Sequence, residues 1–314
     1  MITSVFSKSR PINYILVTIL LVLAFLLCQL NTSEWIHSFA KVVDKILLLC
    51  VLVCSVFVSN FITKKNGLSK DNSYSFLLFF AFLILFPTIF VNTNIIISNF
   101  FVLLALRRLI SLQSLVTPKE KIFDASFWIC MAALFHFWSI LFILLVFISI
   151  IFHVSRDYRN WIIPFIAFSA VVIIYVLADL VFDKTLIFNL LDKVGVEFNF
   201  QYFDNKFQNI AFVFYTVVAV VFLFNQIFTM NSKPINLHAS YKKIIFTFII
   251  GVVVFVLSTH KNNSFLVFTF APMSIMGANL IESFEKYWMK EALIIILLLV
   301  GMIIYISQLP SAIL

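Results

Sequence analysis

Charged side chains are scarce in this sequence. Aspartate, glutamate, lysine and arginine make up 11% of its 314 residues, whereas a soluble domain carries about 25%. Apolar residues make up 63%, and 40 residues are phenylalanine. A soluble protein cannot enclose so much apolar surface in one core, so much of it is expected to face lipid. The composition therefore excludes an ordinary soluble protein and predicts an integral membrane protein.

Glycine and the familiar catalytic motifs are also lacking. The sequence has five glycines, and it contains no Gly-rich phosphate loop, no His-Glu-x-x-His and no Gly-x-Ser-x-Gly motif. These absences argue against ATP-driven transport and weaken the case for a carrier with glycine-interrupted helices. Cys50 and Cys54 share a helix face, but no histidine or carboxylate joins them at ligand spacing. We therefore expect no metal site and no cofactor.

Long apolar runs dominate the chain instead. A spanning helix needs about 20 such residues, or fewer where neighbouring helices shelter it. We predict an all-α, polytopic transmembrane helix bundle of about 11 spans, in a single integral membrane domain over residues 1–314. The predicted spans are 13–30, 45–62, 74–91, 94–106, 124–135, 138–153, 161–181, 210–230, 244–258, 265–281 and 291–309. Whether the short spans 94–106 and 124–135 cross completely stays open.

The region from 124 to 153 is predicted to be a tight hairpin. It turns at 135–138, because basic residues flank it on both sides and both flanks then lie on one side of the membrane. With the N-terminus in the cytoplasm, 16 of the 22 lysines and arginines fall in inner loops, and the six outer ones are all lysines. This bias places the C-terminus in the periplasm of a bacterium with an inner membrane. It also explains the net charge of +8 without a nucleic-acid partner.

Two segments of the predicted outer face are expected to be amphipathic and to lie in the interface. They cover residues 31–44 and 182–209. In the first, Trp35, Phe39 and Val43 recur at helical spacing, with polar residues between them. The second has a similar apolar stripe followed by aromatic residues, which suit the headgroup layer. About half of the acidic residues also lie on this face, so we expect any chemical site there.

Two carboxylates are the candidate catalytic residues. Glu34 and Asp44 lie on the first outer segment, where either is able to act as a general base on an acceptor hydroxyl. The alternative is an ordinary solvated polar face. His136, at the tip of the predicted hairpin, is a candidate cavity residue, and its alternative is a partnered interfacial histidine.

A compact polar turn is the candidate phosphate site. Residues 258–263 read Ser-Thr-His-Lys-Asn-Asn between two apolar spans. At headgroup level His260, Lys261 and Asn262 are able to hold a lipid phosphate through charge and hydrogen bonds. The alternative is an ordinary hydrophilic turn.

Two stretches resemble a known family. They are Lys8-Ser9-Arg10-Pro11-Ile12-Asn13-Tyr14, and the turn from His260 to Asn263 followed by Ala271-Pro272. They resemble an uncharacterised family of polytopic inner-membrane proteins from Bacteroidetes. This resemblance covers most of the chain and implies no function.

The layout is more distantly similar to that of the GT-C glycosyltransferases, which use polyprenyl-phosphate sugars. The resemblance implies that Glu34 matches the acidic residue that those enzymes carry after their first span. Residues 124–153 match their short paired helices, 182–209 their second outer loop, and 258–264 their late polar turn. The sequence departs from the class in having isolated carboxylates and in lacking a large extracytoplasmic domain.

Three functions stay open at this point. The leading hypothesis is a glycosyltransferase of GT-C type that takes sugar from a polyprenyl-phosphate donor at the outer face, for envelope glycan or protein glycosylation. The chief alternative is a non-enzymatic membrane subunit of an envelope assembly for secretion, motility or polymer export, with other envelope proteins as partners. A lipid or polymer transporter is the third. Membrane lipids are expected partners in all three.

Overall fold

The structure is a computed structural model that describes residues 2–29, 39–181, 194–196, 206–259 and 261–308. These residues form helices joined by short turns and contain no strand, which confirms the all-α prediction. The α-helices are α1 (Ile2–Phe6), α2 (Pro11–Gln29), α3 (Phe39–Lys65), α4 (Tyr74–Leu85), α5 (Thr93–Ser111), α6 (Pro118–Phe135), α7 (Ile143–His153), α8 (Arg159–Val181), α10 (Lys206–Thr229), α11 (Ile235–Leu257), α12 (Phe270–Ser283) and α13 (Tyr287–Gln308). The 3₁₀ helices are η2 (Pro87–Val91), η3 (Leu112–Ser114), η4 (Phe137–Phe142), η6 (Met230–Ser232) and η7 (Asn263–Thr269).

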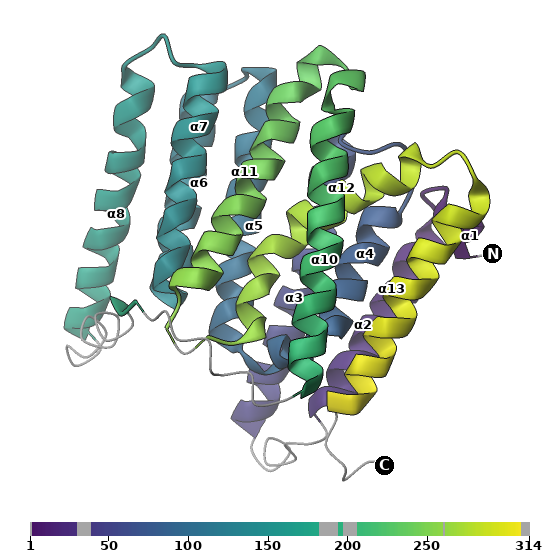
Figure 1. Cartoon of the computed structure of the whole chain (residues 1–314). Coiled ribbons are helices and arrows are strands. Elements are labelled where there is room, and N and C mark those ends of the chain that lie inside the picture. Colours follow the sequence, from purple (N-terminus) through teal and green to yellow (C-terminus); the bar gives the residue numbers. More distant parts are fainter. Residues whose placement is uncertain (1, 30–38, 182–193, 197–205, 260, 309–314) are drawn as a thin grey trace.

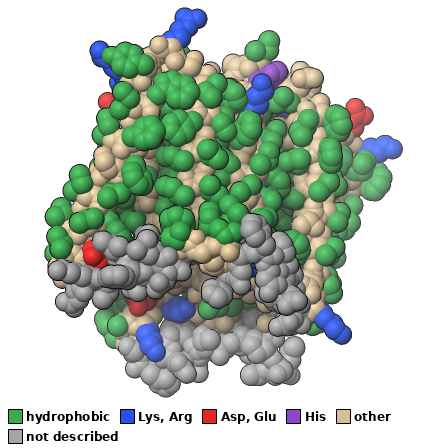
Figure 2. All heavy atoms as spheres, turned by 60° about the vertical axis from the view of Figure 1, so that its left-hand side comes forward, with side chains coloured by type: hydrophobic (Ala, Val, Ile, Leu, Met, Phe, Trp, Pro, Cys, Tyr) green, Lys and Arg blue, Asp and Glu red, His purple; other side chains and the backbone are tan. Residues whose placement is uncertain are grey.

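Long apolar helices indicate a multi-pass membrane protein. Within the described part of the chain, eight helical stretches are long and apolar enough to cross a membrane, and two shorter apolar ones accompany them. They stand side by side, with α8 at one edge of the bundle (Figure 1). Figure 2 shows the face on the α8 side covered by hydrophobic side chains, with most charged side chains toward its margins. Eleven crossings and their orientation stay predictions.

One end of the bundle is rich in lysine and arginine. The α7–α8 and α10–α11 loops lie there, at the top of Figure 1, and they carry Arg156 and Lys233. We call this the basic end. The beginnings of α3 and α10 lie at the bottom of Figure 1, which we call the opposite end.

Two helices in the middle of the bundle are enclosed on all sides. All 12 residues of α4 are buried, and the stretch formed by η7 and α12 is buried throughout its most apolar window. Phenylalanine rings join the two helices: Phe270 lies 6.0 Å from Phe79 and 5.7 Å from Phe82, measured between ring centroids. The outer helices expose apolar side chains instead, both aliphatic and aromatic, such as Ile173 and Phe165 of α8.

The N-terminal helices pack against α13. Thr3 donates a hydrogen bond from Oγ1 to Glu291 Oε2 at 2.5 Å, and the Tyr305 hydroxyl donates to the carbonyl of Ala24 in α2. Both contacts join residues more than 280 positions apart. They close the bundle between its two chain ends.

Several sequence predictions change in the structure. Residues 39–44, predicted as part of a separate interfacial helix, belong to α3, which runs without a break to Lys65. Residues 30–38 lie outside the described residues, as does most of the second predicted interfacial segment, 182–209. The hairpin at 135–138 is confirmed, because α6 ends at Phe135, η4 begins at Phe137, and Lys119 near the start of α6 pairs with Asp157 beyond the end of α7.

The predicted spans 74–91 and 265–281 are each helical but change type along their length. Pro87 begins η2, and the preceding amide of Phe86 donates to Leu83 O in a shorter i to i−3 bond. Proline has no N–H and its ring clashes with the carbonyl four residues earlier, which favours the end of α4 before it. The second segment begins as η7 and becomes α12 at Phe270.

Gly277 tests the packing around α12. A methyl group there would meet Phe222 Cε2 at less than contact distance and would lie 2.8 Å from Leu78 Cδ1. Overpacking of this kind costs about 1–3 kcal/mol. We therefore expect Gly277→Ala to lower the melting temperature of the detergent-purified protein, as followed by tryptophan fluorescence.

Gly301→Ala is the matched control. Its added methyl group would have its nearest neighbour, Ala81 O, at an ordinary 3.6 Å, so little change is expected. Equal melting temperatures for the two variants would contradict the enclosed packing of α12.

Candidate functional site

Three 3₁₀ helices meet at the opposite end of the bundle. Asn92, which follows η2, donates from Nδ2 to Ser264 Oγ of η7 at 3.0 Å. The rings of Phe142 in η4 and Phe268 in η7 lie 6.0 Å apart. A 3₁₀ stretch within a longer helical segment often marks a hinge or a functional region. We call η2, η4, η7 and the polar residues between them the 3₁₀ cluster.

His136 links two distant parts of this cluster. It ends α6 in an extended backbone conformation, and its Nε2 lies 3.0 Å from Ser258 Oγ at the end of α11. Ser258 Oγ donates to Val254 O at 2.6 Å, so the hydroxyl has no second proton and Nε2–H of His136 is the donor. The imidazole also packs on Phe265, with ring centroids 4.8 Å apart.

Two described residues of the turn after Ser258, Lys261 and Asn263, are buried. Lys261 is 4% exposed, so its ammonium group lies within the protein and not in open solvent. Asn262 caps η7 by accepting from the Ser264 amide at 3.4 Å. Asn263 donates from Nδ2 to Gln208 O at 3.1 Å, which ties the turn to the first turn of α10.

A short segment covers this turn. The indole N–H of Trp138 donates to Gly195 O at 3.1 Å, and a Cβ on Gly195 would lie 2.9 Å from Thr259 Cγ2. Only glycine fits at this approach without a shift of Thr259. The predicted second outer segment therefore contacts the 3₁₀ cluster through its described residues 194–196.

An apolar groove begins next to His136. It has a volume of about 310 Å³ and lies between α6, η4 and α8. It is lined by Cys130, Ala133, Leu134, Phe137, Ile140, Phe168, Val171, Val172, Tyr175 and Val176. The lining suits a hydrocarbon chain, because it offers apolar contact and few polar groups that would lose water on binding.

The structure places three of the predicted site residues beside the 3₁₀ helices η4 and η7. His136, Lys261 and Asn262 all belong to the 3₁₀ cluster. Asp44 is exposed near the beginning of α3, and among the described residues no hydrogen bond or ion pair joins it to the cluster. Glu34 and His260 lie outside the described residues.

Sequence reasoning missed a buried lysine. The predicted span began at 244, which placed Lys243 in an inner loop. In the structure α11 begins at Ile235, and Lys243 is a fully buried residue of this helix. Its Nζ donates to Leu109 O at 2.6 Å and lies 3.1 Å from His153 Nε2. Because the helix begins before its apolar run, a search for apolar windows leaves out the lysine in its first turns. Ionisable groups inside membrane helices are expensive and are commonly functional.

Comparison with known proteins decides the family. The model of DUF6427, a family of unknown function, matches residues 1–312. The chain belongs to this family. No curated protein and no solved structure matches it. Membership of DUF6427 brings no activity, so the function has to be argued from the geometry of the chain.

The hydrogen bond between His136 and Ser258 is open to a double-mutant cycle. We expect His136→Phe and Ser258→Ala each to lower the free energy of unfolding, and the double variant to lose less than their sum. The coupling should be about 0.5–1.5 kcal/mol, the usual value of one intramolecular hydrogen bond. Thermal unfolding in detergent measures it.

Ser169→Ala provides the control partner, because this exposed serine bonds only within α8. His136→Phe combined with Ser169→Ala should show additive effects. A zero coupling between His136 and Ser258 would mean that the two side chains do not meet.

Proposed function

We propose that this protein is a membrane glycosyltransferase of GT-C type in a bacterial inner membrane, as the resemblance to Bacteroidetes proteins and to that enzyme class implies. The donor is a sugar carried on a polyprenyl phosphate, and the acceptor is an envelope glycan or a protein. In this proposal the basic end faces the cytoplasm, which puts the 3₁₀ cluster at the outer face. One observation supports it most: His136 contacts Ser258, three residues before the buried Lys261, and its neighbour Phe137 lines an apolar groove.

The division of the site suits a lipid-linked donor. The groove between α6 and α8 gives the isoprenoid chain an apolar path along the bundle. Lys261 and His136 would receive the phosphate, which becomes the leaving group of the transfer. Negative charge develops on that phosphate as the glycosidic bond breaks, and fixed cationic and N–H donors stabilise it most in the transition state.

The remaining role is a general base on the acceptor. Glu34 is the proposed base, with Asp44 as the second candidate, because a carboxylate at the outer face is able to remove the hydroxyl proton as the new bond forms. The proposal requires the segment before α3 to approach the 3₁₀ cluster.

A lipid or polymer transporter is the second candidate. The observation in its favour is the change from α to 3₁₀ geometry in the two enclosed segments of the bundle. Transporters build substrate sites from such discontinuous helices, where unwound backbone groups face the substrate. A transporter would move the lipid without breaking the bond between phosphate and sugar.

Binding and transfer are measured separately to test the proposal. Undecaprenyl phosphate should bind the protein in lipid nanodiscs, as detected by native mass spectrometry, and Lys261→Gln should weaken binding at least about tenfold by removing a charge-assisted contact. Lys41→Gln is the matched control, because Lys41 is an exposed cation at the beginning of α3. It should leave binding unchanged.

Transfer is then assayed with a panel of radiolabelled polyprenyl-phosphate sugars and membranes as acceptor. Glu34→Ala should abolish transfer while undecaprenyl phosphate still binds. Undiminished transfer by a folded Glu34→Ala protein would exclude the assigned base. Binding without any transfer would favour the transporter, and no binding together with a partner protein in fixed ratio would favour the assembly subunit.

A further inference from the structure

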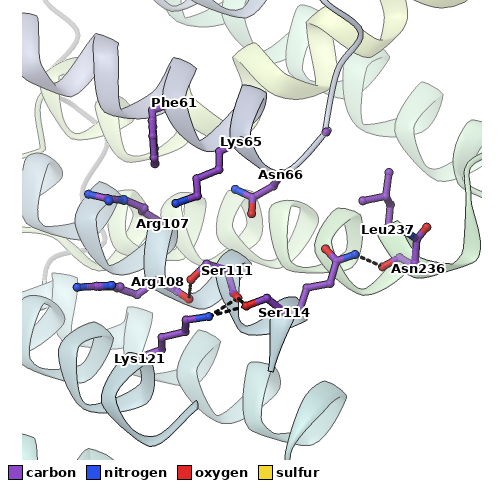
Figure 3. Close-up of a pocket in the computed structure, with 12 residues that line it drawn as sticks. Phe61, Lys65, Asn66, Arg107, Arg108, Ser111, Ser114, Lys121, Asn236 and Leu237 are labelled. Carbon is purple, nitrogen blue, oxygen red and sulfur yellow. Dashed lines mark hydrogen bonds between the residues drawn. The ribbon is translucent and has the colours of Figure 1, made fainter. Parts of the chain in front are cut away.

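A second cavity opens at the basic end. It has a volume of about 660 Å³ and lies where α3 and α5 end and α6 begins (Figure 3). Four of its lining residues are cationic, and none of them is acidic: the full lining is Phe61, Lys65, Asn66, Gly67, Arg107, Arg108, Ser111, Gln113, Ser114, Lys121, Asn236 and Leu237. Sequence reasoning treated these lysines and arginines only as signals for orientation.

Two of the cations are held in place by one aromatic ring. The guanidinium carbon of Arg107 lies 4.6 Å from the ring centroid of Phe61, and Lys65 Nζ lies 5.2 Å from it. These contacts join side chains of two neighbouring helices, α3 and α5, and Phe61, Lys65 and Arg107 lie together in the cavity lining (Figure 3). Cations held by aromatic contact keep their charge available to a ligand, because the ring neutralises none of it.

Lys121 forms the opposite wall. It is 9% exposed, and its Nζ donates to Ser111 O at 2.8 Å and to Ser114 Oγ at 2.7 Å. Burial lowers the pKa of its ammonium group, and the nearby charges of Arg108 and Lys65 lower it further. Lys121 also lies in the first turn of α6, where the helix dipole favours an anion over a cation.

The charge in this cavity is poorly compensated by the protein. Arg108 pairs with Asp124 at 2.9 Å, which leaves Lys65, Arg107 and Lys121 facing the same space without an acidic residue in the lining. The end of α3 stabilises Lys65, which lies in its last turn, but it does so equally well whichever way such a residue points. Orientation in the membrane depends on the number of cations in the loops. It does not require several of them to line one cavity.

The loop between α5 and α6 has a strained backbone beside this cavity. Leu115 and Thr117 have φ values of 54° and 43°, in the left-handed region that is uncommon for residues other than glycine. Such strain persists where the surrounding structure holds it, and it is concentrated at ligand-binding sites. The strained loop brings Ser114 and Lys121 into the cavity wall.

We propose that this cavity binds a phosphate group, with Lys65 and Arg107 as the charged contacts and Lys121 as the fixed wall. A guanidinium and two ammonium groups around one water-accessible space match the charge and the acceptor oxygens of a phosphate. The group belongs to a soluble phosphate compound or to the headgroup of an anionic phospholipid. This inference concerns the other end of the bundle and does not rest on glycosyl transfer.

Thermal stabilisation by defined anions tests the site. The detergent-purified protein is melted in inorganic phosphate, in pyrophosphate and in chloride at matched ionic strength. In parallel, retention of phosphatidylglycerol and of phosphatidylcholine is compared by native mass spectrometry after delipidation. A shift with phosphate or pyrophosphate identifies a soluble ligand, and selective retention of phosphatidylglycerol identifies a lipid headgroup. In Lys65→Gln/Arg107→Gln, the apparent affinity for the responding phosphate compound or lipid is expected to fall at least about tenfold.

Arg10→Gln/Lys286→Gln is the matched control. It removes one arginine and one lysine, both exposed in loops outside the cavity, and should bind as the parent protein does. The charge-preserving Lys65→Arg/Arg107→Lys variant and the two single glutamine variants serve if the double variant does not fold. Equal binding by the parent and the glutamine variants, or no response to phosphate, pyrophosphate or phosphatidylglycerol, overturns the proposal.

Discussion

The fold depends on one constraint: a backbone polar group within the membrane must find its partner inside the protein. A regular α-helix meets this requirement alone, and a helix that changes type does so only under cover of its neighbours. The segments α4–η2 and η7–α12 both change type, and α4 and the window of η7–α12 are buried. The surrounding helices therefore do more than fill space around them. They provide the sheltered environment in which irregular backbone is tolerated.

Enclosure also explains how the polar residues are distributed. The turns that join the irregular segments carry Asn92, His136 and Ser258, and each finds a partner on another segment. The cations at the basic end lie at helix termini, where chain ends bring several of them to one cavity. Polar chemistry in this protein is thus concentrated at the two ends of the bundle. Buried polar pairs also join residues within the helices, as Lys243 with His153 and Asn279 with Gln226 do.

Composition and apolar runs were sufficient to predict the helices, because an apolar run is a property of consecutive residues and can be read without knowing their partners. The hairpin at His136 was likewise predictable from its flanking charges. The 3₁₀ cluster was not, because His136 and Ser258 are 122 positions apart and no local pattern brings them together. Pro87 was the one local sign of a break in the third span. Lys243 escaped notice for a different reason, since its burial depends on where α11 begins and not on its apolar run.

The contact between the N-terminal helices and α13 has a consequence for biosynthesis. Helix α2 leaves the ribosome long before α13, yet Ala24 and Thr3 have their partners on α13. During translation the face of α2 that will contact α13 therefore remains exposed to lipid or to the insertion machinery. Assembly of this bundle cannot finish in the order in which its helices are made.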